Sequence, residues 1–443
     1  MAANTVIQMP SVTGEQNPIG TAYTVSPLTA GPTFPASIDT YAIFTRPTAN
    51  PENVTYWIAA RAGSGTFRIL DRNFQQINSV NLGANSTAAA MSPMGDRFVI
   101  LTNLLRIFNA ETGAEIQVPF IDVGPSPNDV AISQNGRRAF VMSAFGQRVT
   151  AIDLQTNTAL GSIPLPGINQ GTIAIGPNGL LYVSAQNRVL EVDGSQPTFD
   201  SASIRRQFQI SGNIGRLQFT PDGTRALAVN QNTAAGPVVY LINLEAAGGG
   251  VATLNVSDPL LGSVTFDKLY VISNSRAFAI SSSTSSPPRR LYQLAIPDLP
   301  AAGQNLTPPT VSEAFFGSLA TIPIVENLTF SKEFPSARQL FISAPLNLLN
   351  STVPSELYQI DATNNNLNSK VTLNFIPGFS QYVTPAQPAV TAQPGLVNSL
   401  NGVQPAIPVN GRALPIGVRV TTSTGQPIFG LTVTFTANVQ GVQ

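Results

Sequence analysis

Residues 127–167, "PNDVAISQNGRRAFVMSAFGQRVTAIDLQTNTALGSIPLPG", contain one complete unit of the pattern that decides the fold. An opening strand leads to the turn Asn135-Gly136, and an apolar strand, a third strand ending near Asp153 and a fourth strand follow. Asn-Gly favours a tight hairpin because both residues tolerate a positive φ. The stretch therefore predicts four antiparallel strands in chain order.

The same unit recurs along the chain. Its turn glycines, Gly95, Gly136, Gly179 and Gly223, are spaced 41, 43 and 44 residues apart, in "MSPMGDRFVILTN", "ISQNGRRAFVMSA", "IGPNGLLYVSAQ" and "FTPDGTRALAVNQ". Further third strands, "TFRILD", "RVLEVDG" and "ELYQIDATNN", extend the register toward both ends. Four strands repeated at such a period indicate the blades of a β-propeller, whose ring protects the strand edges.

We expect an all-β chain built around a seven-bladed propeller of four-stranded antiparallel blades. Eight blades stay open as an alternative if residues 1–37 supply more than a closing strand. The expected blade ranges are 38–83, 84–124, 125–167, 168–211, 212–258, 259–317 and 318–383.

Composition excludes several classes of function. Charged residues make up only 10% of the 443 residues, and Lys plus Arg equals Asp plus Glu at 23 each, so no basic field would attract nucleic acid. The chain has no His and no Cys, which excludes the usual zinc ligands, thiol nucleophiles and His-based triads. We therefore expect no enzymatic activity and no cofactor.

The location is predicted from what the sequence does and does not contain. No run of 18 apolar residues occurs, so we expect no membrane span, and the first residues show no signal peptide. The low-charge, Thr- and Asn-rich composition favours an extracellular or cell-surface protein.

The end of the chain reads differently from the repeats. Residues 384–410 are rich in proline and uncharged, which favours a semi-rigid linker. Residues 411–443 contain two segments in which apolar and polar residues alternate, the pattern of half-buried strands. The apolar positions are Ile416, Val418 and Val420 in one segment, and Leu431, Val433 and Phe435 in the other.

The unit at 127–167 resembles the YVTN-type β-propeller repeat of bacterial and archaeal surface proteins. The shared features are a Pro-x-x-x-Ala opening, a glycine turn and an end of the type Ile-Asp-x-x-Thr-Asn. The Tyr-Val strand of the family is matched by Tyr182-Val183 in the next repeat, and Phe140-Val141 is close to it. Residues from about 395 to 443 resemble the first half of an invasin-type bacterial immunoglobulin-like domain. That second resemblance implies a structural spacer or adhesive stalk.

Several polar groups are candidates for sites, and each has a plainer structural interpretation. Asp71, Asp153, Asp193 and Asp361 recur at one place in their repeats, where a carboxylate would bind a metal or cap a turn, and we favour the cap. The pairs Arg205-Arg206 and Arg289-Arg290 would hold an anion or be solvated loop residues, and we favour the loop. Tyr56-Trp57 would be a sugar platform or core, and we favour the core.

Six Asn-x-Ser/Thr sequons would be exposed acceptors in a host that glycosylates its surface proteins. They lie at Asn53, Asn85, Asn255, Asn305, Asn327 and Asn350.

The ends of the chain favour self-assembly as the function. An immunoglobulin-like half-domain leaves an open edge, and the N-terminal extension 1–37 contains strand-like pieces, "TVIQM" and "TAYTV". A first strand donated to the next subunit would give a head-to-tail filament or surface layer. Alternatively, the N-terminal strand closes the propeller ring of its own chain and is not donated to another subunit. The expected interface residues are Val6, Ile7, Met9, Val418, Val420, Leu431, Val433 and Phe435.

A monomeric adhesion or ligand-binding propeller on an immunoglobulin-like stalk, as a fragment of a longer protein, is the second hypothesis. In either case the expected partners are another copy of the chain, a surface glycan or a surface protein.

Overall fold

The computed structural model describes the strands and most of their connections. The described residues are 5–8, 29–33, 40–46, 55–60, 65–71, 76–116, 119–231, 237–245, 250–255, 264–282, 290–300, 305–313, 327–330, 339–345, 355–361 and 365–373. The chain divides into two compact units, residues 1–47 with 55–384 and residues 48–54 with 385–443, and every described residue belongs to the first. The predicted linker and immunoglobulin-like module lie outside the described residues.

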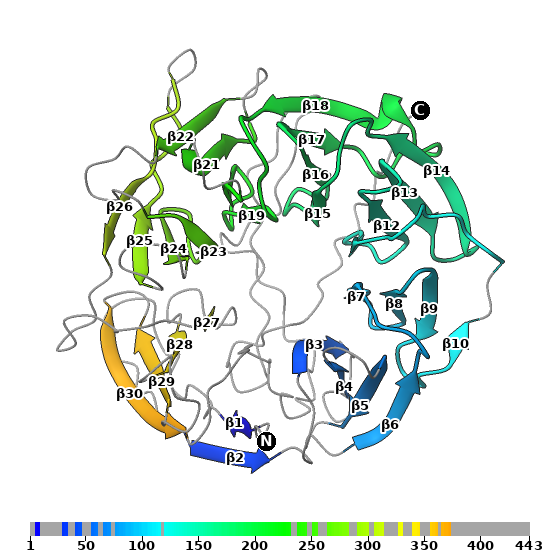
Figure 1. Ribbon diagram of the computed structural model, residues 1–443, viewed down its shortest axis with the longest axis horizontal. Coiled ribbons are helices and arrows are strands. Elements are labelled where there is room, and N and C mark those ends of the chain that lie inside the picture. The colour runs from blue at the N-terminus through cyan, green and yellow to red at the C-terminus, as the bar shows by residue number, and fades with distance from the viewer. Residues whose placement is uncertain are drawn as a thin grey trace, which may run out of the picture. The chain divides into compact units, whose positions relative to one another are not determined.

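The described chain is all-β apart from the short 3-10 turn η2 (Ser201–Ser203). Its strands form seven four-stranded antiparallel sheets and one two-stranded sheet (Figure 1). None of the described segments is a helix long and apolar enough to cross a membrane.

The sheets consist of the following strands. The two-stranded sheet is β1 (Thr5–Gln8) and β2 (Thr29–Thr33). The first three four-stranded sheets are β3 (Thr40–Arg46), β4 (Thr55–Ala60), β5 (Thr66–Leu70) and β6 (Gln76–Asn81); β7 (Ala88–Met91), β8 (Arg97–Leu101), β9 (Leu105–Asn109) and β10 (Glu115–Ile116); and β11 (Asp129–Ile132), β12 (Arg138–Ser143), β13 (Arg148–Asp153) and β14 (Thr158–Pro164). The next two are β15 (Gly171–Ile175), β16 (Leu181–Ala185), β17 (Arg188–Val192) and β18 (Ile204–Gln209); and β19 (Gln218–Phe219), β20 (Arg225–Val229), β21 (Pro237–Asn243) and β22 (Val251–Asn255). The last two are β23 (Phe266–Val271), β24 (Arg276–Ser281), β25 (Leu291–Ala295) and β26 (Thr310–Glu313); and β27 (Asn327–Phe330), β28 (Gln339–Pro345), β29 (Ser355–Asp361) and β30 (Asn366–Leu373).

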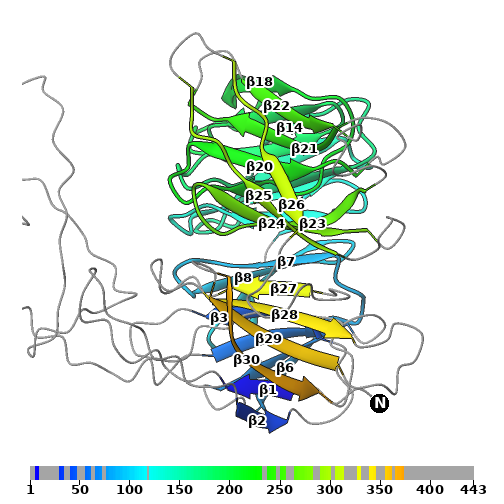
Figure 2. The same ribbon diagram turned by 90° about the vertical axis from the view of Figure 1, so that its left-hand side faces the viewer.

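Each four-stranded sheet uses four consecutive strands and lies within one of the ranges predicted for a blade. The first strands of neighbouring sheets contact one another, as β7 contacts β3 and β11, and β11 contacts β15. Figure 1 shows these first strands around a central opening, with β14, β18, β22 and β30 at the periphery. Figure 2 shows from the side that β23–β26 and β27–β30 form separate sheets, one above the other in this view. The predicted propeller-like arrangement is therefore present.

The predicted hairpin turns have the geometry that glycine allows. Gly95, Gly136, Gly179 and Gly223 all have a positive φ, between 68° and 79°. Each glycine N–H donates to the carbonyl of the residue three positions earlier, at 2.8 or 2.9 Å. A residue with positive φ at the end of the turn lets a short loop connect two twisted antiparallel strands. Glycine adopts this conformation without steric strain because it has no Cβ.

Two faces of the ring follow from this strand order. One face carries the turns between first and second strands, with the four glycines, and the turns between third and fourth strands; we call it the glycine-turn face. The other carries the turns between second and third strands and the connections from one sheet to the next; we call it the connector face. Antiparallel order fixes this division for every sheet.

The hydrophobic core lies between neighbouring sheets. Between the first two four-stranded sheets, Trp57 is fully buried and packs on Phe67, Phe98 and Phe108. The Trp57 indole N–H donates to the carbonyl of Ala110 at 2.9 Å. The core interpretation of Trp57 is confirmed, and the side chain of Tyr56 lies outside the described residues.

Arginines at the start of three second strands, β12, β20 and β24, tie their sheets to the next one. Arg138 donates to the carbonyls of Gly194 and, at 2.6 Å, Gln196 in the β17–β18 turn. Arg225 donates to the carbonyl of Pro297 after β25, and Arg276 donates to the side-chain oxygen of Asn365 before β30. We call these side chains the arginine straps. They join neighbouring sheets across the glycine-turn face and were not predicted.

The N-terminal strand predicted at "TVIQM" is β1, which pairs antiparallel with β2 through Ile7–Ala30 and Gln8–Thr29. Neither strand belongs to any four-stranded sheet of the described chain. The second piece, "TAYTV", lies outside the described residues.

Candidate functional site

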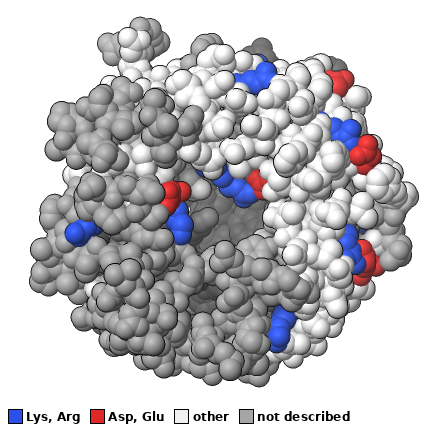
Figure 3. Space-filling model, in the orientation of Figure 1, with Lys and Arg blue, Asp and Glu red and all other residues white. Residues whose placement is uncertain are grey.

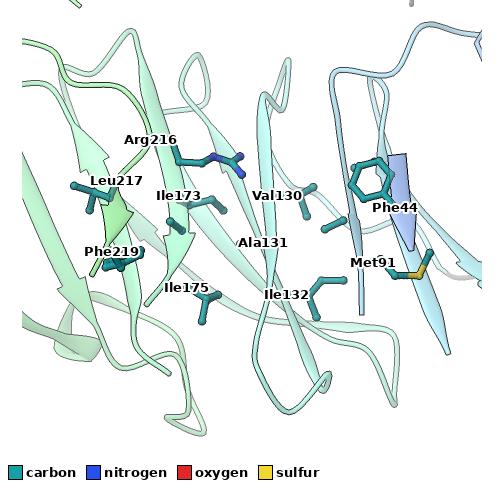
Figure 4. Close-up of a pocket in the computed structure, with 13 residues that line it drawn as sticks. Phe44, Met91, Val130, Ala131, Ile132, Ile173, Ile175, Arg216, Leu217 and Phe219 are labelled. Carbon is teal, nitrogen blue, oxygen red and sulfur yellow. The ribbon is translucent and has the colours of Figure 1, made fainter. Parts of the chain in front are cut away.

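The first strands of five sheets surround a central cavity of about 510 Å³ (Figure 4). Its walls are mostly apolar, and small side chains recur on them because the strands converge here. Ala90, Ala131 and Ala174 occupy the same place in three consecutive sheets, one residue before the end of the first strand, and each is half-buried. Arg216 is the charged side chain among the residues that line the cavity.

One ion pair crosses this cavity. The Asp129 carboxylate, at the start of β11, pairs with the Arg216 guanidinium just before β19. Asp129 also accepts the backbone N–H groups of Val130 and Ile173, each at 2.9 Å. The Ile173 donor lies in β15, so three successive sheets meet at one carboxylate. Figure 4 shows the Arg216 side chain extending from its sheet toward β15 and Val130.

The electrostatics of this pair limit its chemistry. Burial raises the pKa of the Asp129 carboxyl, while the Arg216 guanidinium and the two backbone donors act in the opposite direction. Because both carboxylate oxygens already accept hydrogen bonds, Asp129 has little capacity left to take a proton from a substrate. The geometry fits a clamp that holds three sheets together at the axis.

Sequence reasoning missed this pair, although the sequence contains a signal for it. Asp129 and Arg216 each lie seven residues before the turn glycine of their repeat, Gly136 and Gly223. Equivalent positions in two repeats lie at the same level along the axis of a propeller. Two residues of opposite charge at such positions on the inner strands can therefore form an ion pair.

The connector face exposes three large apolar side chains. Leu104 is 50% exposed, Phe120 77% and Phe145 75%. Leu104 lies in the β8–β9 turn, Phe120 in the β10–β11 connection and Phe145 in the β12–β13 turn. We call these three residues the apolar triad.

The elements that carry the apolar triad are neighbours. The Asp122 carboxylate, two residues after Phe120, pairs with Arg148 at the start of β13. The Ser143 hydroxyl donates to the carbonyl of Pro125 at 2.5 Å, so the β10–β11 connection lies against the β12–β13 turn. Ile121 packs in the same core cluster as the ends of β8 and β9, beside Leu104.

The face of the molecule in Figure 3 carries few charged groups among its described residues. Figure 3 shows a hollow at the centre of the ring with basic and acidic atoms at its rim, and mostly uncharged atoms on the described surface around it. This pattern agrees with the low charge content of the chain.

Two of the four aligned aspartates, Asp153 and Asp193, cap turns as predicted. Asp153 accepts the backbone N–H groups of Gln155 at 2.7 Å and Thr156 at 2.9 Å, and the Thr156 bond holds the pKa of Asp153 below its usual value. Asp193 accepts the hydroxyl of Ser195 at 2.6 Å, which likewise lowers its pKa. Among the described residues no three His, Cys, Asp or Glu side chains group together as metal ligands would.

The loop interpretation of Arg205 and Arg206 is wrong. Both residues lie in β18, where Arg205 is exposed and Arg206 points to the other side of the strand. Arg206 donates to both oxygens of the buried Glu191 carboxylate, at 3.0 and 2.5 Å, and to the carbonyl of Leu244 in the next sheet. A strand places alternate residues on opposite sides, and β17 supplies the acidic partner opposite Arg206. Arg289 lies outside the described residues.

The other predicted sites are only partly described. Val6 and Ile7 lie in β1, but their side chains and the remaining predicted interface residues fall outside the described set. Of the six sequons, Asn85 and Asn305 are described with exposed side chains. The assembly and glycosylation predictions stay predictions.

Comparison with known proteins identifies the fold. No family model matches the chain, and no curated protein matches it in sequence. The C-terminal WD40 domain of Sif2 is similar in structure, with a TM-score of 0.51 and 10% identity over 71% of this chain and 82% of that one. WD40 repeats form β-propellers. The fold is therefore β-propeller-like.

Two other solved structures match at lower TM-scores. Kluyveromyces lactis Hsv2 matches at 0.45 with 12% identity, over 65% of this chain and 89% of that one. Kuenenia stuttgartiensis hydrazine synthase matches at 0.43 with 14% identity, over 62% of this chain and 76% of that one. At such identities a likeness concerns the fold alone, and it carries no information about activity.

Proposed function

We propose that the chain is a non-enzymatic, extracellular seven-bladed β-propeller of the YVTN type that binds a partner on its connector face. The seven four-stranded sheets support the blade count. The lack of His and Cys, together with the engaged Asp129 carboxylate, supports a function without catalysis.

The observation that carries this proposal is the apolar triad. Large apolar side chains grouped on one rigid face are typical of binding surfaces, because their burial against a partner is favourable. Burying one phenylalanine contributes about 1.5–3 kcal/mol, which corresponds to a tenfold or greater change in affinity.

The test is sedimentation of the purified protein with isolated cell envelopes of the source organism. We expect the double variant Phe120→Ser/Phe145→Ser to bind at least tenfold more weakly than the unaltered protein. Met94→Ser is the matched control because Met94 is exposed on the glycine-turn face. Equal binding by all three proteins, or no binding by any, would contradict the proposal.

Self-assembly by strand complementation is the second candidate function. The two-stranded β1–β2 sheet favours it, because among the described strands neither β1 nor β2 has a partner along its second edge. An open edge accepts a strand from another chain. The proposed acceptor is the immunoglobulin-like half-domain, through Val418, Val420, Leu431, Val433 and Phe435.

Electron microscopy of the native material tests the assembly proposal. Regular fibres that disappear when residues 1–25 are deleted would support strand exchange. Discrete particles in both samples would remove it and leave the propeller as a monomeric binding module.

A further inference from the structure

A second cavity, of about 410 Å³, opens on the connector face between the β11–β14 and β15–β18 sheets. One wall is the β14–β15 connection at Pro166 and Gly167. The opposite wall is formed by the β16–β17 turn at Gln186 and Asn187 and by the outer strand β18. We call this cavity the amide pocket. Its volume is that of a site for a small ligand or for a few units of a chain.

The wall on β18 presents amides in a fixed arrangement. Gln207 and Gln209 are two residues apart on one side of the strand, and the Gln207 amide N–H donates to the Gln209 amide oxygen at 3.0 Å. Gln209 lies directly opposite Arg188 in the β17–β18 register. The Gln207 amide oxygen and the Gln209 amide nitrogen have no hydrogen-bond partner among the described residues, so each is available to a ligand.

Asn187 is held in place by the backbone. Its side-chain oxygen accepts the N–H of Gly212 at 2.9 Å, and its own φ is +61°. This bond leaves the Asn187 amide N–H₂ as a donor beside the cavity. The pocket thus combines amide donors, amide acceptors and a single guanidinium, that of Arg188.

An exposed aromatic residue lies on a turn that is hydrogen-bonded to one wall of this cavity. The β12–β13 turn carries Phe145, and Gln147 of this turn accepts the N–H of Gly167 with its side-chain oxygen at 3.2 Å. The backbone carbonyl of Gln147 accepts the N–H of Leu165 at 2.6 Å. The Phe145 turn is therefore bonded directly to one wall of the amide pocket.

We propose that the amide pocket and Phe145 together form a binding site for a hydroxyl-rich oligosaccharide. An amide offers a donor and an acceptor side by side, which matches two neighbouring sugar hydroxyls, each a donor and an acceptor. The flat apolar face of a sugar ring packs on an exposed aromatic ring. The single guanidinium of Arg188 can pair with one acidic group of a bound sugar chain. One such group is too few for the pocket to be primarily an anion-binding site.

This inference rests on the proposed binding function and assigns its ligand class. The probes are cellohexaose, mannohexaose, chitohexaose and hexagalacturonate, measured by titration calorimetry on the full chain. We expect one or more of them to bind, and we expect Gln209→Ala and Phe145→Ala each to weaken that binding by about tenfold, the loss typical of one well-placed contact.

Two further variants sharpen the result. Gln155→Ala, an exposed amide on the glycine-turn face, is the matched control and should bind like the unaltered protein. Arg188→Gln should weaken the binding of hexagalacturonate more than the binding of the neutral sugars, because the Arg188 guanidinium pairs with a carboxylate more strongly than with a hydroxyl. Loss of binding in Gln209→Ala and Phe145→Ala but not in Gln155→Ala would support the site at the amide pocket. The effect of Arg188→Gln would then show whether the ligand carries an acidic group.

The contrary results are equally clear. Failure of all four sugars to bind, or binding that Gln209→Ala and Phe145→Ala leave intact, would overturn the assignment. If envelope binding still depends on Phe120 and Phe145 while no sugar binds, the binding function stands and the carbohydrate site falls.

Discussion

Removal of one arginine strap should destabilise the packing between two neighbouring sheets. In Arg138→Ala, the carbonyls of Gly194 and Gln196 lose the charged donor that joins the β11–β14 sheet to the β17–β18 turn. Hydrogen bonds from charged groups contribute about 1.5–3 kcal/mol each when buried. Arg138 is half-buried, so water partly replaces the lost donor. We expect a loss of about 2 kcal/mol in the free energy of unfolding for the two bonds together.

The neighbouring Arg137 provides the matched control. Its side chain is exposed and its guanidinium has no hydrogen-bond partner among the described residues, so Arg137→Ala should change stability by less than about 0.5 kcal/mol. Urea unfolding followed by circular dichroism measures both variants. Amide hydrogen exchange should also show faster opening of residues 193–203 in Arg138→Ala alone.

Conservative replacement separates charge from geometry. Arg138→Lys keeps the charge but cannot reproduce the planar fork that reaches two carbonyls, so we expect an intermediate loss of stability. If Arg138→Ala and Arg137→Ala unfold at the same urea concentration, the straps do not stabilise the ring and this reasoning is refuted.

Three other predictions concern single positions. Gly161 has a φ of 130° and a Cβ there would lie 2.4 Å from the backbone oxygen of Phe199, so Gly161→Ala should lower the free energy of unfolding by several kcal/mol, measured by calorimetry. Gly179→Ala should cost about 1 kcal/mol, because a Cβ there would make only an ordinary contact of 3.6 Å with the Gln134 side chain; equal costs would contradict this. Trp57→Phe should lower stability by about 2–3 kcal/mol because it leaves a cavity and the Ala110 carbonyl unpaired; an unchanged thermal midpoint would contradict this. Asp153 has a lowered pKa in the folded state, so its stabilisation is complete above its ordinary pKa of 3.8 and is lost as the pH falls through the lower folded value. Asp153→Asn should therefore be less stable than the unaltered protein near neutral pH, and the difference should shrink as the pH falls below 3.8, measured by urea unfolding at each pH; a difference that does not change with pH would contradict this.

The turn chemistry made most of the fold predictable. A glycine after Asn or Asp between apolar strands has few alternatives to a hairpin, and Gly136, Gly179 and Gly223 adopt the predicted positive φ. Once the turns are fixed, the repeat spacing divides the chain into sheets, and each observed sheet lies in its expected range. Local residue preferences were sufficient for this level of structure.

Contacts between sheets were harder to predict, because they depend on which residues of different strands lie at the same level along the ring axis. Arg206 illustrates the difficulty. Its partner Glu191 is 15 residues away and meets it only through the β17–β18 register, which a bulge shifts between Glu191 and Val192. Without that register, an Arg-Arg pair resembles a solvated loop. The Asp129–Arg216 pair is likewise visible only when two distant repeats are superimposed.

The amide pocket could not be predicted from the sequence, for a related reason. Its residues come from the β14–β15 connection, the β16–β17 turn and β18, and each segment alone is an ordinary polar stretch. Gln207 and Gln209 become a pair because β18 places them on the same side of one strand, and they face Pro166 because neighbouring blades pack side by side.

The distribution of charge links the architecture to the proposed function. A chain with so few charged residues uses many of them at seams: Arg138, Arg225 and Arg276 join neighbouring sheets, Arg206 pairs with Glu191 and reaches the next sheet, and Arg216 clamps three sheets at the axis. On the described connector face, amides, hydroxyls and exposed aromatic rings stand beside a few charged groups, among them the Asp122–Arg148 pair and Arg188. Such a surface recognises a ligand by shape and hydrogen bonding, which is the mode of recognition that a hydroxyl-rich chain requires.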